Sequence, residues 1–231
     1  MSSRRGADAL IASGSVRVNG RVPPPGGMLV EPERDHVTVD GRSVRPPAGH
    51  RYLALNKPPG AIVTARDPQG RRTVFDLVGD ELEPRRLFAV GRLDVATGGL
   101  LLLTDDGELA NRLAHPRHKV GKEYVATVGG TPSERDLRAL REGIELDGRP
   151  TQPAEVELLG SAGGSAQLRI VVREGRYRQV RRMLEAVGHP ARELTRTAFG
   201  PVRLGRLRAG GWRRLRPAEL EALRRAAGLA P

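Results

Sequence analysis

The chain has 231 residues, enough for one or two domains, and its apolar fraction of 38% and charged fraction of 29% argue against disorder throughout. It contains no cysteine and no long apolar run, so we expect a cytoplasmic protein without disulfides, thiolate metal ligands or a membrane span. Its formal net charge of +12 favours a polyanionic partner, and nucleic acid is the usual one for a chain this basic.

The first 42 residues predict a small α/β module. A short helix over residues 3–14 has a serine that can cap its start and a glycine that can end it. Residues 16–18 and 37–39 alternate as strands do, and the Asn-Gly pair after the first of them is a hairpin signal. Two adjacent prolines and a glycine then predict a linker over residues 43–50.

Residues 51–231 predict a larger α+β domain. The apolar run 100–103 is typical of a strand buried on both faces. We expect further strands over residues 52–55, 124–128, 154–159 and 167–172, and helices over residues 108–114, 131–141, 178–187 and 217–227. The second of these helices is expected to begin with a capping box at Thr131 and a proline at its first helical position. Because strands and helices interleave irregularly, we predict a large mixed, mostly antiparallel sheet with flanking helices.

Asp94 lies in a glycine-rich loop just before the apolar strand, where its carboxylate should be partly exposed. An aspartate in such a loop usually makes an Asx turn or a cap. Two features favour a functional role instead. Arg92 is two residues away, and Gly98-Gly99 would let the backbone of a ligand approach closely. No second carboxylate in a comparable setting indicates an acid–base pair.

Tyr124 follows a basic cluster that includes Lys119 and Lys122. An aromatic ring beside basic side chains is what base stacking requires, although a tyrosine at the start of a strand also suits a core position. The densest basic run covers residues 174–183, where an apolar stripe should face the core. The arginines of this run would then lie on a solvent-exposed face of the helix. Alternatively, one of them turns inward and pairs with a carboxylate. No spacing of histidines indicates a metal site, and no glycine motif for a nucleotide cofactor occurs.

The string 91–107, GRLDVATGGLLLLTDDG, resembles the catalytic motif of bacterial ribosomal-RNA pseudouridine synthases of the RsuA/RluB type. Residues 55–60, 174–183 and 194–201 agree with the same family and follow in the same order. Residues 1–42 resemble the small RNA-binding module shared with ribosomal protein S-four, without the helix that normally precedes its Ser-Arg-Arg. The resemblance therefore implies a pseudouridine synthase fold behind a shortened module.

The resemblance also implies an activity, the isomerisation of uridine to pseudouridine in RNA without cofactor or metal. Asp94 matches the essential aspartate of the family, acting as a nucleophile or as a stabiliser of charge at the sugar carbon. Tyr124 matches the tyrosine that stacks on the uracil. Arg181 matches the basic residue that pairs with the catalytic carboxylate and keeps it ionised, with Arg176 as its rival.

Other positions are expected to bind the substrate. Leu194 would close the second side of the base, and Arg92 would hold a nucleotide that has been flipped out of its stack. Arg176 and Gln179 would also contact the substrate. The basic residues expected to contact RNA elsewhere are Arg4, Arg5, Arg17, Lys57, Lys119 and Lys122.

Residues 109–116 resemble most closely the branch of the family that acts on large-subunit (23S) ribosomal RNA. We therefore expect a monomer that acts on ribosomal RNA or on ribosome-assembly intermediates. Three alternatives stay open: a synthase for small-subunit (16S) RNA, a non-catalytic protein that binds ribosomal RNA or assists assembly, and a hydrolase that uses Asp94 on a glycosidic bond.

Overall fold

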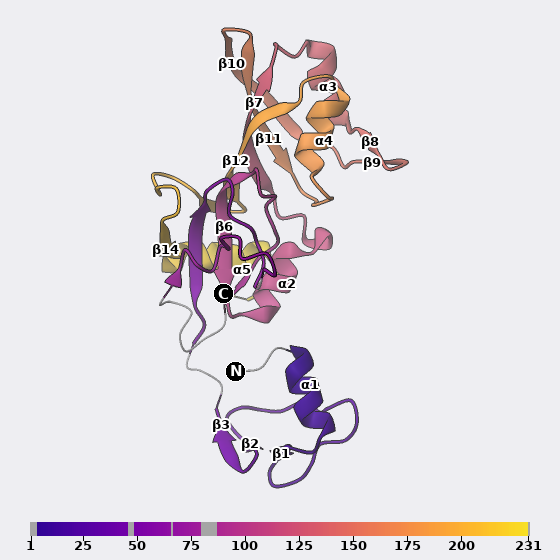
Figure 1. The fold of residues 1–231 in the computed structure, drawn as a ribbon. Helices are drawn as coiled ribbons and strands as arrows, with labels where there is room; N and C mark the ends of the chain where they lie inside the picture. The colour runs from indigo at the N-terminus through magenta and orange to yellow at the C-terminus, as the bar shows by residue number, and fades with distance from the viewer. Residues whose placement is uncertain (1–3, 46–48, 66, 80–86, 231) are drawn as a thin grey trace. The chain divides into compact units, whose positions relative to one another are not determined.

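The computed structural model describes residues 4–45, 49–65, 67–79 and 87–230. The chain divides into two compact units, Met1–His50 and Arg51–Pro231 (Figure 1). Each unit has its own sheet. Within the described residues, no helix has the length and apolarity that crossing a membrane requires.

The first unit contains helix α1 (Arg4–Ala12) and an antiparallel sheet of β1 (Val16–Val18), β2 (Val37–Val39) and β3 (Arg42–Val44). The Asn-Gly pair reverses the chain after β1, with φ values of 51° and 78°, but it closes only a single bridge between Val18 and Arg21. The sheet partner of β1 is β2. Ser43 and Val44 lie in β3, so the predicted linker began too early. A turn with positive φ at Asp40 and Gly41 brings this segment back onto β2.

The second unit is built on a nine-stranded sheet whose main order is β10-β11-β7-β12-β6-β4-β14. Among the strand pairs that the structure describes in this sheet, only β12–β6 is parallel, which confirms the predicted α+β fold on a mixed, mostly antiparallel sheet. Its strands are β4 (Tyr52–Lys57), β5 (Phe88–Ala89), β6 (Gly98–Thr104), β7 (Lys122–Gly129), β10 (Glu155–Ala162), β11 (Ser165–Val172), β12 (Ala191–Phe199), β13 (Val202–Arg203) and β14 (Trp212–Arg214). A small hairpin adds β8 (Glu145–Leu146) and β9 (Arg149–Pro150), and the helices are α2 (Gly107–Ala114), the 3-10 turn η2 (Pro116–His118), α3 (Glu134–Glu142), α4 (Gln179–Ala186) and α5 (Pro217–Ala226).

Strand β6 is buried along its whole length because apolar clusters cover both of its faces. Leu101 and Leu103 belong to a cluster that includes side chains of α3 and α4. Leu100 and Leu102 belong to a second cluster that includes side chains of α2 and α5. Since successive residues of a strand point to opposite faces, the two helix pairs cover opposite sides of the sheet. The prediction of a strand buried on both faces is confirmed.

Helix α3 begins two residues later than its sequence signal suggested. Its N-cap is Ser133, whose hydroxyl accepts a hydrogen bond from the backbone N–H of Asp136 at 3.3 Å. The Asp136 carboxylate in turn accepts hydrogen bonds from the backbone N–H and the hydroxyl of Ser133, at 2.8 and 2.7 Å. The cap and its box therefore lie at Ser133 and Asp136 and not at Thr131. Pro132 therefore precedes the cap.

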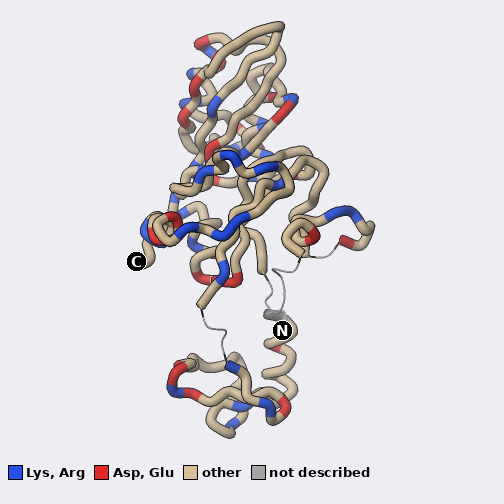
Figure 2. The backbone as a smooth tube through the Cα atoms, turned by 90° about the vertical axis from the view of Figure 1, so that its left-hand side faces the viewer, with Lys and Arg blue, Asp and Glu red and all other residues tan. Residues whose placement is uncertain are grey.

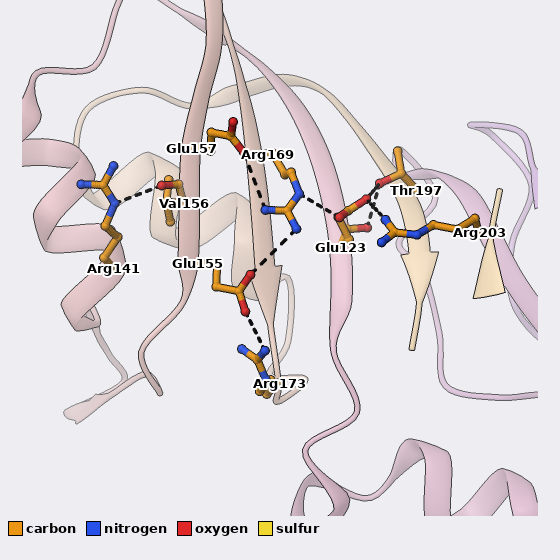
Figure 3. A network of polar contacts seen from close by, with 9 residues as sticks. All are labelled: Glu123, Arg141, Glu155, Val156, Glu157, Arg169, Arg173, Thr197 and Arg203. Atoms are coloured by element: carbon orange, nitrogen blue, oxygen red, sulfur yellow. Dashed lines mark hydrogen bonds and ion pairs between the residues drawn. The ribbon is translucent and has the colours of Figure 1, made fainter. Parts of the chain in front are cut away.

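A polar network holds together the face of the sheet opposite Tyr124 (Figure 3). Glu123 of β7 receives hydrogen bonds from Arg169 and Arg203 at 2.8 Å and from Thr197 at 2.9 Å. Burial works against the ionised form, but these donors hold the pKa of Glu123 below its usual value. The network thus ties β7 to β11, β12 and β13, which fixes the strands that carry the site described below.

Candidate active site

A cavity of about 360 Å³ opens in the second unit, lined by the loop before β6, the start of α4 and the strands β7 and β12. This volume lies in the range usual for small-ligand sites. The cavity brings together most of the residues singled out in the sequence: Arg92, Asp94, Lys122, Tyr124, Arg176, Gln179, Arg181 and Leu194.

Lys57 fixes the loop that carries Asp94. Its ammonium donates hydrogen bonds to the carbonyls of Val95 at 3.2 Å, Thr97 at 2.8 Å and Pro58 at 3.1 Å. The side chain is completely buried, so it cannot contact a phosphate as predicted; its role is to hold the backbone of this loop. Burial lowers the pKa of Lys57 to about 8, although Asp94 opposes this shift.

Arg181, in the first turn of α4, binds the same loop from another side. Its guanidinium donates to the Ala96 carbonyl at 2.9 Å and to the Thr97 hydroxyl at 3.3 Å, and it also reaches the Ala191 carbonyl on β12 at 3.1 Å. Lys57 and Arg181 together therefore bind three consecutive carbonyls of the loop. Two cations hold this turn so that the half-buried Asp94 faces the cavity.

The direct ion pair between Arg181 and Asp94 that the resemblance implies is not formed in the described part of the chain. The three donors of Arg181 are directed at two carbonyls and a hydroxyl instead. Burial and the charge of Arg178 lower the pKa of Arg181, and the negative charge of Asp94 acts in the opposite direction. Arg181 thus positions the loop and supplies positive charge near the carboxylate.

Gly98 and Gly99 allow a close approach, but the approaching backbone belongs to the protein and not to a ligand. A Cβ atom on Gly99 would lie 2.3 Å from the carbonyl oxygen of Arg196 on β12, and the φ of Gly99 is +101°. Only glycine fits such a position. The glycine pair therefore permits the parallel β6–β12 contact, which places the Asp94 loop beside β12.

The floor of the cavity comes from two neighbouring strands. On β7, Lys122 and Tyr124 are two residues apart and share a face, and on β12 the same holds for Leu194 and Arg196. Arg196 lies opposite Tyr124 in the strand register. Tyr124 and Leu194 are largely buried yet line the cavity, so the core and stacking interpretations of Tyr124 are compatible.

Arg176 and Gln179 are held within the protein. The Arg176 guanidinium donates to the carbonyls of Arg149 and Pro150 in the β8–β9 hairpin and lies 3.4 Å from the Glu174 carboxylate. The amide of Gln179 donates to Glu174 at 2.7 Å and accepts from the backbone of Arg176 at 3.0 Å. These contacts shape one wall of the cavity, and neither side chain contacts Asp94 in the described part of the chain.

The other predicted RNA contacts lie outside the cavity. Lys119 is the exposed C-cap residue of η2. Arg17 is exposed on β1, where its guanidinium donates a hydrogen bond to the Gly20 carbonyl at 3.1 Å. Arg4 and Arg5 begin α1, but their side chains lie outside the described residues. These four positions remain predicted RNA contacts.

Arg196 and Phe199 also line the cavity, and sequence reasoning singled out neither of them. Arg196 is 1% exposed and Phe199 is fully buried, and the guanidinium carbon lies 5.2 Å from the ring centroid. The available signal was the spacing of Leu194 and Arg196, which places an arginine on the same strand face as a predicted base contact.

The arrangement can support nucleophilic or electrostatic chemistry at a bound nucleotide. A loop-borne carboxylate faces an aromatic ring and an apolar side chain that can enclose a flat base, and basic residues surround them. Among the described residues, no group of three or more His, Cys, Asp or Glu side chains could hold a metal ion.

Comparisons with known proteins show which family the chain resembles. The family described as RNA pseudouridylate synthase matches residues 51–186. A relative from Aquifex aeolicus (strain VF5), described as an uncharacterized RNA pseudouridine synthase, is 44% identical over 99% of this chain and 91% of its own length. The ribosomal large subunit pseudouridine synthase B of Bacillus subtilis (strain 168) is 41% identical over 97% of this chain and 91% of its own length. A crystal structure of a pseudouridylate synthase matches with a TM-score of 0.71 and 33% identity, over 96% of this chain and 94% of that one.

Proposed function

Because the chain belongs to the RNA pseudouridylate synthase family, we propose that it converts uridine to pseudouridine in large-subunit (23S) ribosomal RNA, with Asp94 as its catalytic carboxylate. The activity itself follows from the family. The target is supported by relatives named as large-subunit enzymes, including the Bacillus subtilis protein at 41% identity and one from Vibrio vulnificus (strain CMCP6) at 42%. We further propose, from the same relatives, that it belongs to the RsuA/RluB branch.

The observation that carries the assignment of Asp94 is the way its loop is held. Two cations bind the carbonyls of Val95, Ala96 and Thr97, which presents the carboxylate to the cavity. A carboxylate in this position can attack the sugar carbon C1′ or stabilise the positive charge that develops there. Such fixed geometry is what positioning of a catalytic group requires.

The other cavity residues have roles in the same reaction. Tyr124 stacks on the uracil and Leu194 closes its second side, so the base stays enclosed while it turns. The bond from C1′ to N1 of the base breaks, the bond from C1′ to C5 forms, and a proton leaves C5 while N1 gains one. No net oxidation occurs, so we propose that the reaction needs no cofactor. Arg92, exposed at the cavity, holds the flipped nucleotide.

We further propose that the first unit contributes to RNA binding. The whole chain carries 39 Lys and Arg against 27 Asp and Glu, and Figure 2 shows basic positions on both units. Excess positive charge attracts the phosphate backbone whatever its sequence. The partner is then ribosomal RNA or an assembly intermediate that still exposes the target uridine, and the enzyme acts on it as a monomer.

The test of the target is a map of pseudouridines in both ribosomal RNAs, made by chemical probing in cells with and without this protein. The proposal predicts that at least one pseudouridine disappears from large-subunit RNA and returns with the parent gene but not with an Asp94→Asn variant. Loss of a site in small-subunit RNA alone would overturn the proposed target. Unchanged maps of both RNAs would contradict ribosomal RNA as the substrate.

A further inference from the structure

Two cations meet at the floor of the cavity, and among the described residues neither forms an ion pair with a carboxylate. The ammonium of Lys122 lies 5.5 Å from the centroid of the Phe199 ring, and the guanidinium carbon of Arg196 lies 5.2 Å from it. The strand register places Lys122 opposite Phe199 and Arg196 opposite Tyr124. One aromatic ring therefore supports two positive charges, both of which line the cavity.

The hydrogen bonds of this pair are incomplete. Arg196 donates from Nε to the Leu100 carbonyl at 2.7 Å, but its buried Nη2 has no hydrogen-bond partner among the described residues. Lys122 makes one long contact, 3.4 Å to the Val120 carbonyl. A buried donor without an acceptor is costly, and the like charge of the half-buried Lys122 adds to that cost. An arrangement of this kind is stabilised when an electron-rich ligand supplies the missing acceptor.

The nearest acidic candidate is already engaged. Glu174 raises the pKa of Lys122 by its charge, but its carboxylate accepts hydrogen bonds from the backbone of Gln152 and from the Gln179 amide, and it lies 3.4 Å from the Arg176 guanidinium. Its carboxylate is therefore already engaged by other residues.

The position of the pair indicates which part of a nucleotide it would meet. Tyr124 and Leu194 are the proposed contacts of the two faces of the uracil, and Lys122 and Arg196 are their neighbours on the same strand faces. A base held between the first two side chains directs an edge at the cations. The phosphates would lie nearer to water, beside the exposed Arg92 and Arg178, because charged groups stay hydrated.

We infer that Lys122 and Arg196 stabilise the negative charge of the uracil while it is detached from its sugar. When the C1′–N1 bond breaks, its electron pair leaves with the base and spreads over N1 and the carbonyl oxygens O2 and O4. Asp94 stabilises the positive charge that develops at C1′, and Lys122 and Arg196 stabilise the negative charge on the detached base. When C5 bonds to C1′ and loses its proton, and N1 is protonated, the charge is neutralised. This inference rests on the proposed placement of the uracil.

Fixed charges aimed at a developing charge are a large catalytic effect, and removing one donor of this kind costs about 10²–10³-fold in rate. We therefore expect Lys122→Met to lower the single-turnover rate by roughly this factor while the affinity for RNA stays within about twofold. Lys122→Arg, which keeps the charge, should retain most of the rate. Arg225→Met on α5 removes the same charge far from the cavity lining and serves as the matched control.

The pH profile gives a signature that a merely structural residue would lack. Burial and the charge of Arg196 lower the pKa of Lys122 to about 8, while Glu174 opposes them. The rate should therefore fall as the pH rises through about 8. In Lys122→Arg this fall should move to higher pH, because arginine stays protonated. If the fall stays near pH 8 in that variant, another group such as Lys57 causes it, and the inference is overturned.

Protein stability supplies a readout that does not depend on the RNA. If Lys122 serves the reaction, Lys122→Met relieves the repulsion from Arg196 and the midpoint of urea unfolding stays equal or rises. A rate and a midpoint that fall together would show a structural role and overturn the inference, as would a rate equal to that of the parent. Rates are measured on total ribosomal RNA with tritium at C5 of uracil, so a wrong large-subunit target does not disturb the comparison. If the parent releases no label, the proposed function fails, and the unfolding midpoint still decides whether Lys122 is structural.

Discussion

At the scale of single residues, Lys57 shows how the loop that carries Asp94 is held. Its ammonium has three carbonyl acceptors and no exposure, so Lys57→Met would leave buried carbonyls without donors. We predict a loss of about 3 kcal/mol or more in the free energy of unfolding, measured by urea denaturation. Lys119→Met changes an exposed lysine and should stay within about 0.5 kcal/mol of the parent. Equal stabilities of the two variants would contradict this role of Lys57.

Arg181 and Arg176 offer a second test at this scale, because both are arginines of the same basic run with different contacts. Arg181 binds the Asp94 loop, whereas Arg176 binds the β8–β9 hairpin. We predict that Arg181→Met lowers the single-turnover rate by about tenfold or more, since a displaced catalytic group is costly. Arg176→Met should chiefly lower the urea midpoint. The rate and the urea midpoint of each variant are measured on the same preparation. A large loss of rate in Arg176→Met with little loss in Arg181→Met would contradict these roles.

The sequence alone identified Asp94, Tyr124 and Arg181 as candidates, and the structure brings all three to one cavity. It could not show how they are connected. Lys57 looks like an exposed basic residue in a turn, since nothing local reveals that three carbonyls surround it. The sequence could not reveal that one nitrogen of Arg196 lacks a hydrogen-bond partner among the described residues, because its surroundings depend on the pairing of strands that are distant in the chain.

At the scale of elements, the parallel contact between β6 and β12 depends on one glycine. A Cβ at Gly99 would come within 2.3–2.9 Å of the Arg196 backbone, and the positive φ adds strain. We predict that Gly99→Ala lowers the free energy of unfolding by about 3 kcal/mol or more. Gly160→Ala in β10 meets nothing within 4 Å and should be nearly neutral. Circular dichroism during urea unfolding measures both variants, and a neutral Gly99→Ala would refute the close approach.

Most helices and strands could be predicted because their periodicities and end signals are local. The continuous apolar run at 100–103 indicated a central strand, and the glycine at 188 indicated the end of α4. The order of strands in the sheet was not accessible, since it depends on packing between distant segments. The predicted start of α3 was wrong for a local reason: Thr131 and Ser133 are both residues that cap helices well, and the observed box closes at Ser133.

At the scale of the whole molecule, the division into two compact units predicts separable contributions. Deleting residues 1–45 should leave the chemical step intact and weaken RNA binding. The slope of log affinity against log salt should become shallower by about 0.7–0.9 for each phosphate group that the shortened protein no longer neutralises. Affinity for a ribosomal-RNA fragment at several salt concentrations tests this. An unchanged slope would show that the first unit does not bind RNA, and a loss of turnover at saturating RNA would show that it helps to build the active site.

The central claim is that Asp94 in its held loop isomerises uridine in large-subunit RNA. The most direct measurement is tritium release from a large-subunit RNA fragment labelled at C5 of uracil, for the parent and for Asp94→Asn. The substitution is nearly isosteric but cannot act as a nucleophile or carry the charge. We predict that the parent releases label without shortening the RNA, and that the variant binds the fragment equally well but is slower by about 10⁴-fold or more. Label release by Asp94→Asn near the parent rate would contradict the account.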